Sequence, residues 1–383
     1  MAKANSRKLL YSSAGVSLVV VLLLVVRVAG QGELRAMSVL TRFSDPKTGG
    51  FATSFAAHPV YEADTIAQTQ SGPLKVKTYT PTDVANAPGM LLLHGVHHLG
   101  MQDPRMVNLA RAMASAGFVV ATPELHDLTE YHVTPQTVDT IGQSAIWFQQ
   151  QTHHAVGIVA LSFAGGLALM AAARPEYADK MGYVLAVGAH DDMARVARFF
   201  ATNLMEEPDG TRVPFQAHEY GVLILAYSHL EDFFTSEDVP VARQSLRQRL
   251  WETPDPMNTA ASLSPAGAGQ MKLLVYHREQ LEKAFLAVIE RHRAEMSAVS
   301  PAGRLKSLTV PVYLLHGAGD NIIPPAESRW LAREVPPSEL RGLLISRALS
   351  HVDVENKVSF RDQWDLIRFM GRVLDEQASL AKH

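Results

Sequence analysis

Cysteine is absent from the 383 residues of the sequence. Without it the chain has no disulfide bond, no thiolate ligand for a metal, no cysteine nucleophile and no lipid attached through an N-terminal cysteine. Proteins on either side of a bacterial membrane can lack cysteine, so this absence leaves the compartment open.

An excess of positive charge is also absent, because 35 Lys and Arg residues stand against 38 Asp and Glu residues and the formal net charge is −3. Proteins that bind nucleic acids usually carry a basic field, so we expect no nucleic-acid partner. Hydrophobic residues make up 47% of the chain, a share that is typical of folded globular proteins and excludes extensive disorder. The length suits one large domain with an insertion, or two unequal domains.

Charged residues are missing from residues 9–26. As a helix this run would span about 27 Å, close to the hydrocarbon thickness of a bilayer. Lys3, Arg7 and Lys8 precede it, and a positive flank on this side favours an N-terminus in the cytoplasm. We predict that residues 1–30 anchor the protein in a membrane, with the body of the chain outside the cytoplasm, on the periplasmic side of a bacterial membrane.

The alternative for the same segment is a cleaved signal peptide. The small residues Val28-Ala29-Gly30 could precede a cleavage site before Gln31, and the product would be a secreted protein. The charge of Arg27 and the length of the apolar run favour the retained anchor.

Short apolar runs alternate with helical patterns over residues 72–190 and again over residues 304–383. Such runs are typical of strands buried in a parallel sheet that helices cover. The predicted strands are Leu74–Tyr79, Gly89–Leu93, Phe118–Thr122, Val156–Leu161, Tyr183–Val187, Val310–Leu315 and Gly342–Arg347. The sequence therefore predicts an α/β fold with a mostly parallel central sheet and helices on both faces.

Residues 191–303 break this alternation, because they contain helical stretches and no convincing strand. We predict that they form a helical cap inserted into the sheet domain. Its aromatic residues, such as Phe199 and Phe200, either belong to the core or face a substrate. Residues 31–71 lack clear periodicity, and we predict a linker and lead-in there.

A serine stands where one predicted strand meets a helix, in the segment Gly157-Ile-Val-Ala-Leu-Ser162-Phe-Ala-Gly-Gly166. Ala160 and Ala164 flank it two positions away on either side, and a tight strand–turn–helix needs small residues there. The amides at the start of the helix favour an anion beside the serine. The pattern indicates a nucleophile elbow, although both glycines of the common Gly-x-Ser-x-Gly motif are alanine; the alternative is a serine that caps a closely packed helix.

This segment and three others resemble the α/β-hydrolase superfamily. The segment Leu91–Gly95 resembles the strand that ends in His-Gly, and the loop after that strand supplies an oxyanion-hole amide. The segment Val312–Pro324 resembles the strand and loop that present the acid of a catalytic triad. Ser350-His351-Val352 lies where the family places its histidine. The resemblance covers residues 72–190 and 304–383.

By this resemblance Ser162, Asp320 and His351 form a triad, in the order along the chain that this fold uses. The backbone N–H groups of Val96 and Phe163 would form the oxyanion hole. A serine needs a base to take its proton, and a carboxylate on the other imidazole nitrogen orients that base. Each of the three follows a predicted strand, and the carboxyl ends of parallel strands lie at one edge of a sheet.

The resemblance implies a hydrolase that cleaves an ester, thioester or amide through an acyl-enzyme intermediate, without a metal or organic cofactor. An acyltransferase could use the same triad if the pocket selects an alcohol or amine over water. A non-catalytic binding protein on the same fold is the third possibility. Together with the predicted anchor, this implies a small-molecule or lipid-like acyl substrate near a membrane.

Several other polar residues are candidates for the site. Asp191 and Asp192 follow a predicted strand and could supply the acid in place of Asp320. The pairs His97-His98 and His153-His154 suggest metal ligands, but adjacent side chains on a strand point apart and no carboxylate cluster accompanies them, so we expect no metal site. The predicted lining of the pocket consists of His94, His97 and His98.

Overall fold

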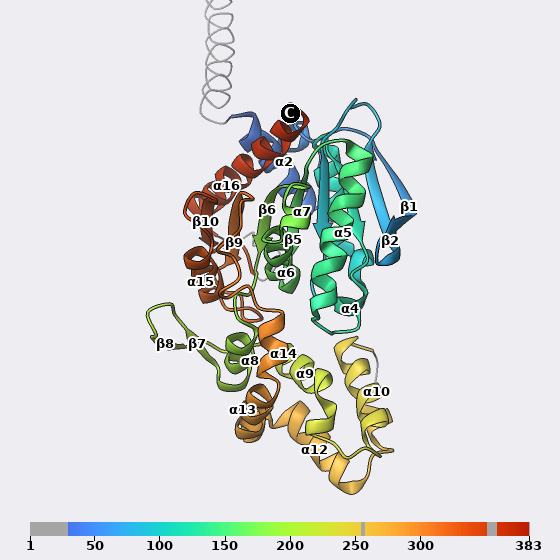
Figure 1. Cartoon of the computed structure of the whole chain (residues 1–383), viewed down its shortest axis with the longest axis vertical. Coiled ribbons are helices and arrows are strands. Elements are labelled where there is room, and N and C mark those ends of the chain that lie inside the picture. The colour runs from blue at the N-terminus through green and yellow to red at the C-terminus, as the bar shows by residue number, and fades with distance from the viewer. Residues whose placement is uncertain (1–29, 254–256, 351–357, 383) are drawn as a thin grey trace, which may run out of the picture.

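The computed structural model describes residues 30–253, 257–350 and 358–382. Its centre is an eight-stranded sheet in the order β1-β2-β4-β3-β5-β6-β9-β10 (Figure 1). The strands are β1 (Val60–Thr69), β2 (Gly72–Pro81), β3 (Gly89–Leu93), β4 (Val119–Pro123), β5 (Val156–Leu161), β6 (Met181–Val187), β9 (Val312–Gly317) and β10 (Leu340–Ser346). Neighbouring strands from β4 to β10 are parallel, whereas β2 is antiparallel to both β1 and β4. The predicted mostly parallel sheet is confirmed.

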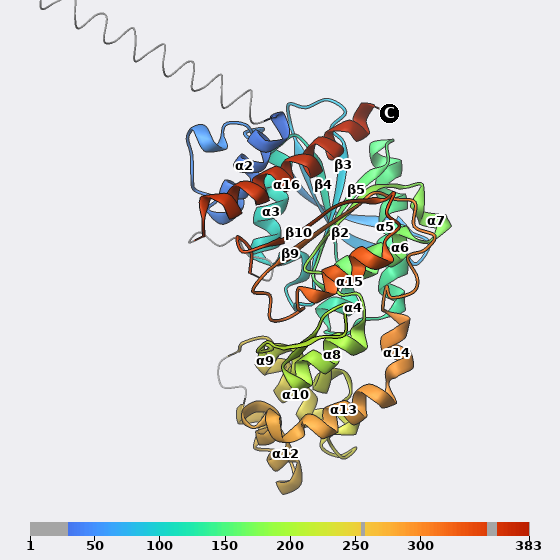
Figure 2. The ribbon, with the colours of Figure 1, turned by 90° about the vertical axis from the view of Figure 1, so that its left-hand side faces the viewer.

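Helices cover both faces of the sheet (Figure 2). On one face lie α2 (Gln31–Ser44), α3 (Pro104–Ser115) and α16 (Phe360–Ser379); on the other lie α5 (Pro135–Thr152), α6 (Phe163–Ala172) and α15 (Ala326–Glu334). Successive side chains of a strand point to opposite faces. Met90 and Leu92 of β3 therefore belong to the core under α2, α3 and α16, and Leu91 and Leu93 belong to the core under α5, α6 and α15. Both sets are buried, which explains why the central strands are continuous apolar runs. Two short helices, α4 (His126–Thr129) and α7 (Pro175–Ala178), complete this part of the chain.

The segment between β6 and β9 forms a mainly helical unit beyond the end of the sheet where β5 meets α6 (Figure 1). Its helices are α8 (Met193–Thr202), α9 (Glu219–Ser228), α10 (Val239–Leu250), α11 (Met257–Ala260), α12 (Pro265–Tyr276), α13 (Glu282–Arg291) and α14 (Arg293–Ala298). This unit also contains a hairpin of β7 (Leu204–Glu206) and β8 (Arg212–Pro214). The prediction that the cap has no strand is therefore wrong for these two short strands, whose residues lie largely at the surface.

Residues 31–71 are part of the folded body, so the predicted linker is also wrong. Helix α2 packs against α16, and β1 pairs with β2 over its whole length. At Gly32 a side chain would overlap the carbonyl oxygen of Gly371 in α16, and Leu34 and Val39 of α2 are buried as well. Strand β1 is an edge strand in which Ala67 alone is fully buried. Strand β1 therefore has no strong alternation of buried and exposed residues.

In the described parts of the chain, no helix is both long and apolar enough to cross a membrane. The predicted anchor is centred on residues 9–26, which lie outside the described residues. The anchor stays a prediction.

Candidate active site

Ser162 occupies the turn between β5 and α6 with φ 57° and ψ −134°. A positive φ in a residue with a Cβ costs about 1–3 kcal/mol and persists only where the surroundings impose it. Here the N–H of Ser162 donates to the carbonyl of Val187 at 2.7 Å, and its own carbonyl accepts from the N–H of Gly165 at 2.9 Å. Ala160 and Ala164 are fully buried on either side. The local geometry is that of the predicted elbow.

The loop after β3 lies directly against this serine. A Cβ added at Gly95 would lie 2.8 Å from the Cβ of Ser162. The carbonyl of Gly95 is 2.8 Å from Nδ1 of His94, and Nε2 of His94 accepts from the N–H of Leu125 at 2.9 Å. Nδ1 therefore carries the proton and donates it, and burial lowers the pKa of His94 to about 4, which keeps the ring neutral.

This arrangement orients a possible oxyanion donor. The carbonyl of Gly95 and the N–H of Val96 belong to one trans peptide and point in opposite directions. Because His94 binds that carbonyl, it fixes the direction of the Val96 N–H. The carbonyl of Val96 in turn accepts from the hydroxyl of Tyr220 at 3.1 Å, so the cap helix α9 also holds the loop.

Asp320 is buried in the loop after β9. Its Oδ1 accepts from the N–H groups of Ile322 and Ile323 at 2.9 and 3.0 Å. Its Oδ2 lies 3.3 Å from Nε2 of His316. Nδ1 of His316 is also 2.6 Å from Oγ of Ser328, so both the loop and its carboxylate are held in place from inside the sheet domain.

His351 lies outside the described residues, but the chain that leads to it is placed as far as Ser350. A Cβ at Gly317, the last residue of β9, would overlap the carbonyl oxygen of Ser350. The segment before His351 therefore crosses the carboxyl end of the strand that precedes Asp320. The three predicted triad positions follow β5, β9 and β10.

Gly317 makes this crossing possible, and its substitution gives a prediction. We expect Gly317→Ala to lower the free energy of unfolding by about 3 kcal/mol, because backbone must move to admit the methyl group. Gly319→Ala is a matched control, since nothing lies within 4 Å of a Cβ there. Urea denaturation of both variants measures the effect, and equal stabilities would contradict the predicted crossing.

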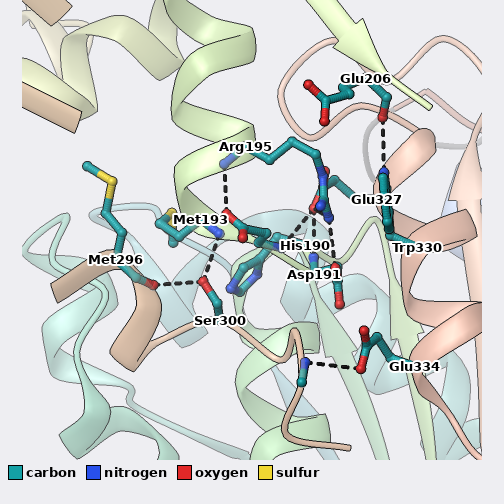
Figure 3. Close-up of polar contacts among 12 residues, drawn as sticks. His190, Asp191, Met193, Arg195, Glu206, Met296, Ser300, Glu327, Trp330 and Glu334 are labelled. Carbon is teal, nitrogen blue, oxygen red and sulfur yellow. Dashed lines mark hydrogen bonds and ion pairs between the residues drawn. The ribbon is translucent and has the colours of Figure 1, made fainter. Parts of the chain in front are cut away.

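Asp191 and Asp192, the alternative candidates for the acid, belong to a network of hydrogen bonds and ion pairs outside the cavity. Nη2 of Arg195 donates to Oδ2 of Asp191 at 2.7 Å, and Nε of Arg195 donates to Oε1 of Glu327 at 2.6 Å (Figure 3). The N–H groups of Asp191 and Asp192 donate to Oε2 of Glu327, and Asp192 caps α8. These carboxylates tie the end of β6 to the first cap helix and to α15. Neither aspartate lines the cavity that contains Ser162.

The network predicts a pH dependence of stability. Burial and the neighbouring Glu327 raise the pKa of Asp191 to about 7, against the opposing effect of Arg195. Between about pH 4 and 7 the folded state holds a proton that the unfolded state has released, so the free energy of unfolding falls as pH rises. We expect this group to contribute a fall of about 2 kcal/mol between pH 5 and 8. Denaturation of Asp191→Asn should lack that part of the fall; an unchanged pH slope would contradict the assignment.

A cavity of about 230 Å³ contains Ser162 and both predicted oxyanion donors, Val96 and Phe163. His94 and His97 line it. His98 does not, because its ring stacks on Trp251 with 5.1 Å between centroids. The wall also includes residues that the sequence did not single out, namely Phe43 of α2, Arg105, Tyr220 and Glu252. No pattern in the sequence marks them, because they converge only through packing.

The cap holds a cluster with potential metal ligands, His229, Asp232 and His292, whose ligand atoms lie within 4.8 Å of one another. Neither adjacent histidine pair of the sequence belongs to it. Asp232 is already paired with Arg291 and lies 2.7 Å from Nε2 of His292. A cation would have to compete with that arginine for Asp232, and the ring of His229 stacks on that of His292.

A scan of protein-family models gives no match, and a search of curated proteins gives none either. Among solved structures, the chain is similar to an acylaminoacyl peptidase of Pyrococcus horikoshii, with 11% identity, a TM-score of 0.48 and coverage of 85% of this chain and 42% of that chain. It is also similar to a dipeptidyl peptidase 4 of Porphyromonas gingivalis, with 12% identity, a TM-score of 0.48 and coverage of 84% and 36%. An esterase of Pyrobaculum calidifontis is similar as well, with 13% identity, a TM-score of 0.44 and coverage of 91% of this chain and 92% of that chain.

This chain spans less than half the length of either peptidase. At these identities the likeness says nothing about the chemistry of the site. What this site can do follows from its own residues.

Proposed function

We propose that this protein is a serine hydrolase that cleaves an ester, thioester or amide through an acyl-enzyme intermediate. The observation that carries the proposal is the strained, buried Ser162 at the strand-to-helix turn, against the loop of Gly95. Strain of this kind concentrates at functional sites. A serine that only capped a helix would not require it.

The proposed reaction begins when Oγ of Ser162 attacks the carbonyl carbon and passes its proton to His351. The N–H groups of Val96 and Phe163 bind the oxyanion, and Phe163, at the first position of α6, lies where helix N–H groups have no partner within the helix. His351 then protonates the leaving group. The same histidine next takes a proton from water, which attacks the acyl-enzyme, and returns it to Oγ of Ser162 as the acid leaves. Asp320 orients His351 and stabilises its charged form.

Turnover of p-nitrophenyl acetate and butyrate by the full chain tests this proposal. Activity in the parent protein that is lost in Ser162→Ala supports it. A folded protein without turnover of esters, thioesters or amides would favour a binding protein on the same fold. If products with added alcohols are mainly new esters, the enzyme is an acyltransferase that uses the same serine.

A further inference from the structure

A second cavity, of about 200 Å³, lies between the sheet domain and the cap. Among the described residues, Phe163 alone lines both this cavity and the one that contains Ser162. Phe163 follows the nucleophile directly in the chain. The two cavities therefore share one wall residue, and the mechanism above gives the second cavity no role.

The second cavity has an apolar interior. Most of its buried lining comes from α8, α9 and the end of the cap, and includes Ala197, Phe200, Ile224, Leu225, Met296 and Val299. The lining also includes polar residues nearer the surface, since Glu295 is exposed and His132 and His229 are half-buried. Phe163 is one of its buried apolar residues. An apolar group that enters this cavity from the side of Ser162 would pass from water into apolar surroundings.

Neighbouring contacts fix the Phe163 ring. The ring packs against that of His190, with 5.2 Å between centroids, and Nε2 of His190 donates to the carbonyl of Val299 at 2.9 Å. Oγ of Ser300 accepts from the N–H of Met193 at 2.9 Å and donates to the carbonyl of Met296 at 2.7 Å (Figure 3). These bonds tie α8 to the end of the cap, so the cavity has a defined wall rather than a loose gap.

We propose that the second cavity binds the apolar acyl chain of the substrate, and that the Phe163 side chain sets which acyl chains pass from Ser162 into it. This inference rests on the proposed function and names its substrate class: esters or thioesters with acyl chains longer than acetyl. Each buried methylene should raise kcat/KM by about fourfold. The leaving group then occupies the first cavity, whose lining combines the polar Arg105, Glu252 and His97 with apolar residues such as Met106, Leu109 and Leu250.

The test compares p-nitrophenyl octanoate with p-nitrophenyl acetate. In the parent protein we expect octanoate to have a kcat/KM at least about tenfold above that of acetate. Ala197→Phe, which fills the cavity from α8, should lower the octanoate value about tenfold and leave acetate unchanged. Phe163→Ala keeps the backbone N–H but removes the side chain that separates the two cavities. The kcat/KM for octanoate relative to that for acetate should therefore rise.

Ala201→Phe is the matched control. It lies on the same helix but lines a different cavity, so both substrates should behave as in the parent protein. Ile224→Phe, from α9, repeats the filling experiment if Ala197→Phe does not fold. Octyl acetate, with the long chain on the alcohol, should gain less over ethyl acetate than p-nitrophenyl octanoate gains over p-nitrophenyl acetate.

The outcomes separate this inference from the function beneath it. If acetate is hydrolysed through Ser162 but neither filling variant changes the ratio, the acyl-chain site is wrong and the hydrolase stands. A preference for octyl acetate would likewise overturn it, since the cavity would then take the alcohol. If no ester, thioester or amide is cleaved, the proposed function fails and this inference fails with it.

Discussion

Ser162→Ala is expected to lower ester turnover by about 4–6 orders of magnitude, because attack by Oγ is the step on which the proposed chemistry depends. Alanine keeps the Cβ in the same strained backbone, so the free energy of unfolding should hardly change. Steady-state kinetics with p-nitrophenyl butyrate and urea denaturation measure the two quantities. A variant that kept more than a few per cent of the activity would remove Ser162 from the mechanism.

Ser162→Gly provides the control for strain. Glycine adopts a φ of 57° without the Cβ penalty, so this variant should be inactive yet more stable than the parent by about 1 kcal/mol. An inactive but stabilised protein is the result expected when backbone strain is kept for function. A loss of stability in Ser162→Gly would indicate that the turn is not strained.

Asp320→Asn is expected to lower kcat by about 10⁴-fold, as the loss of the orienting carboxylate does in a triad. The loop should survive the change, because an amide oxygen can still accept from Ile322 and Ile323. Circular dichroism and kcat against pH separate a lost fold from a lost orienting group.

Asp191→Asn is the matched control for this prediction. Asp191 is equally buried and also follows a strand, but its carboxylate binds Arg195 in the network that holds the cap. We expect its turnover to stay close to that of the parent. If Asp191→Asn were the severe variant and Asp320→Asn the mild one, the acid would have been assigned to the wrong strand.

Much of the sheet could be predicted from the sequence, because strands buried on both faces are short apolar runs. β5 is an example: it was predicted with the bounds that the structure has. Elements at the edge of the fold lack such runs. β1 exposes half of its side chains, and α2 meets α16 at Gly32, where the two helices leave no room for a side chain.

The β7–β8 hairpin was missed although a signal existed. Its connection contains Pro208-Asp209-Gly210, a combination typical of a turn. The strands on either side have three residues each, too few to establish a period of two. For so short a hairpin the turn residues are therefore a stronger signal than the alternation of the strands.

The local parts of the site were predictable, whereas its roof was not. The turn at Ser162 depends on residues within a few positions of it, so a local motif predicts it. Tyr220 reaches Val96 across 124 positions of the chain, and only the packed cap brings them together. The stacking of His98 on Trp251 is of the same kind, and it is why that histidine does not line the cavity.

The most direct test of the central claim is labelling of the full chain with a fluorophosphonate, followed by peptide mapping. The account predicts one adduct per chain, on Ser162, which is absent from Ser162→Ala and from His351→Ala. An adduct on a different serine, or none on a folded protein whose cavity admits the probe, would contradict the claim that Ser162 is an activated nucleophile.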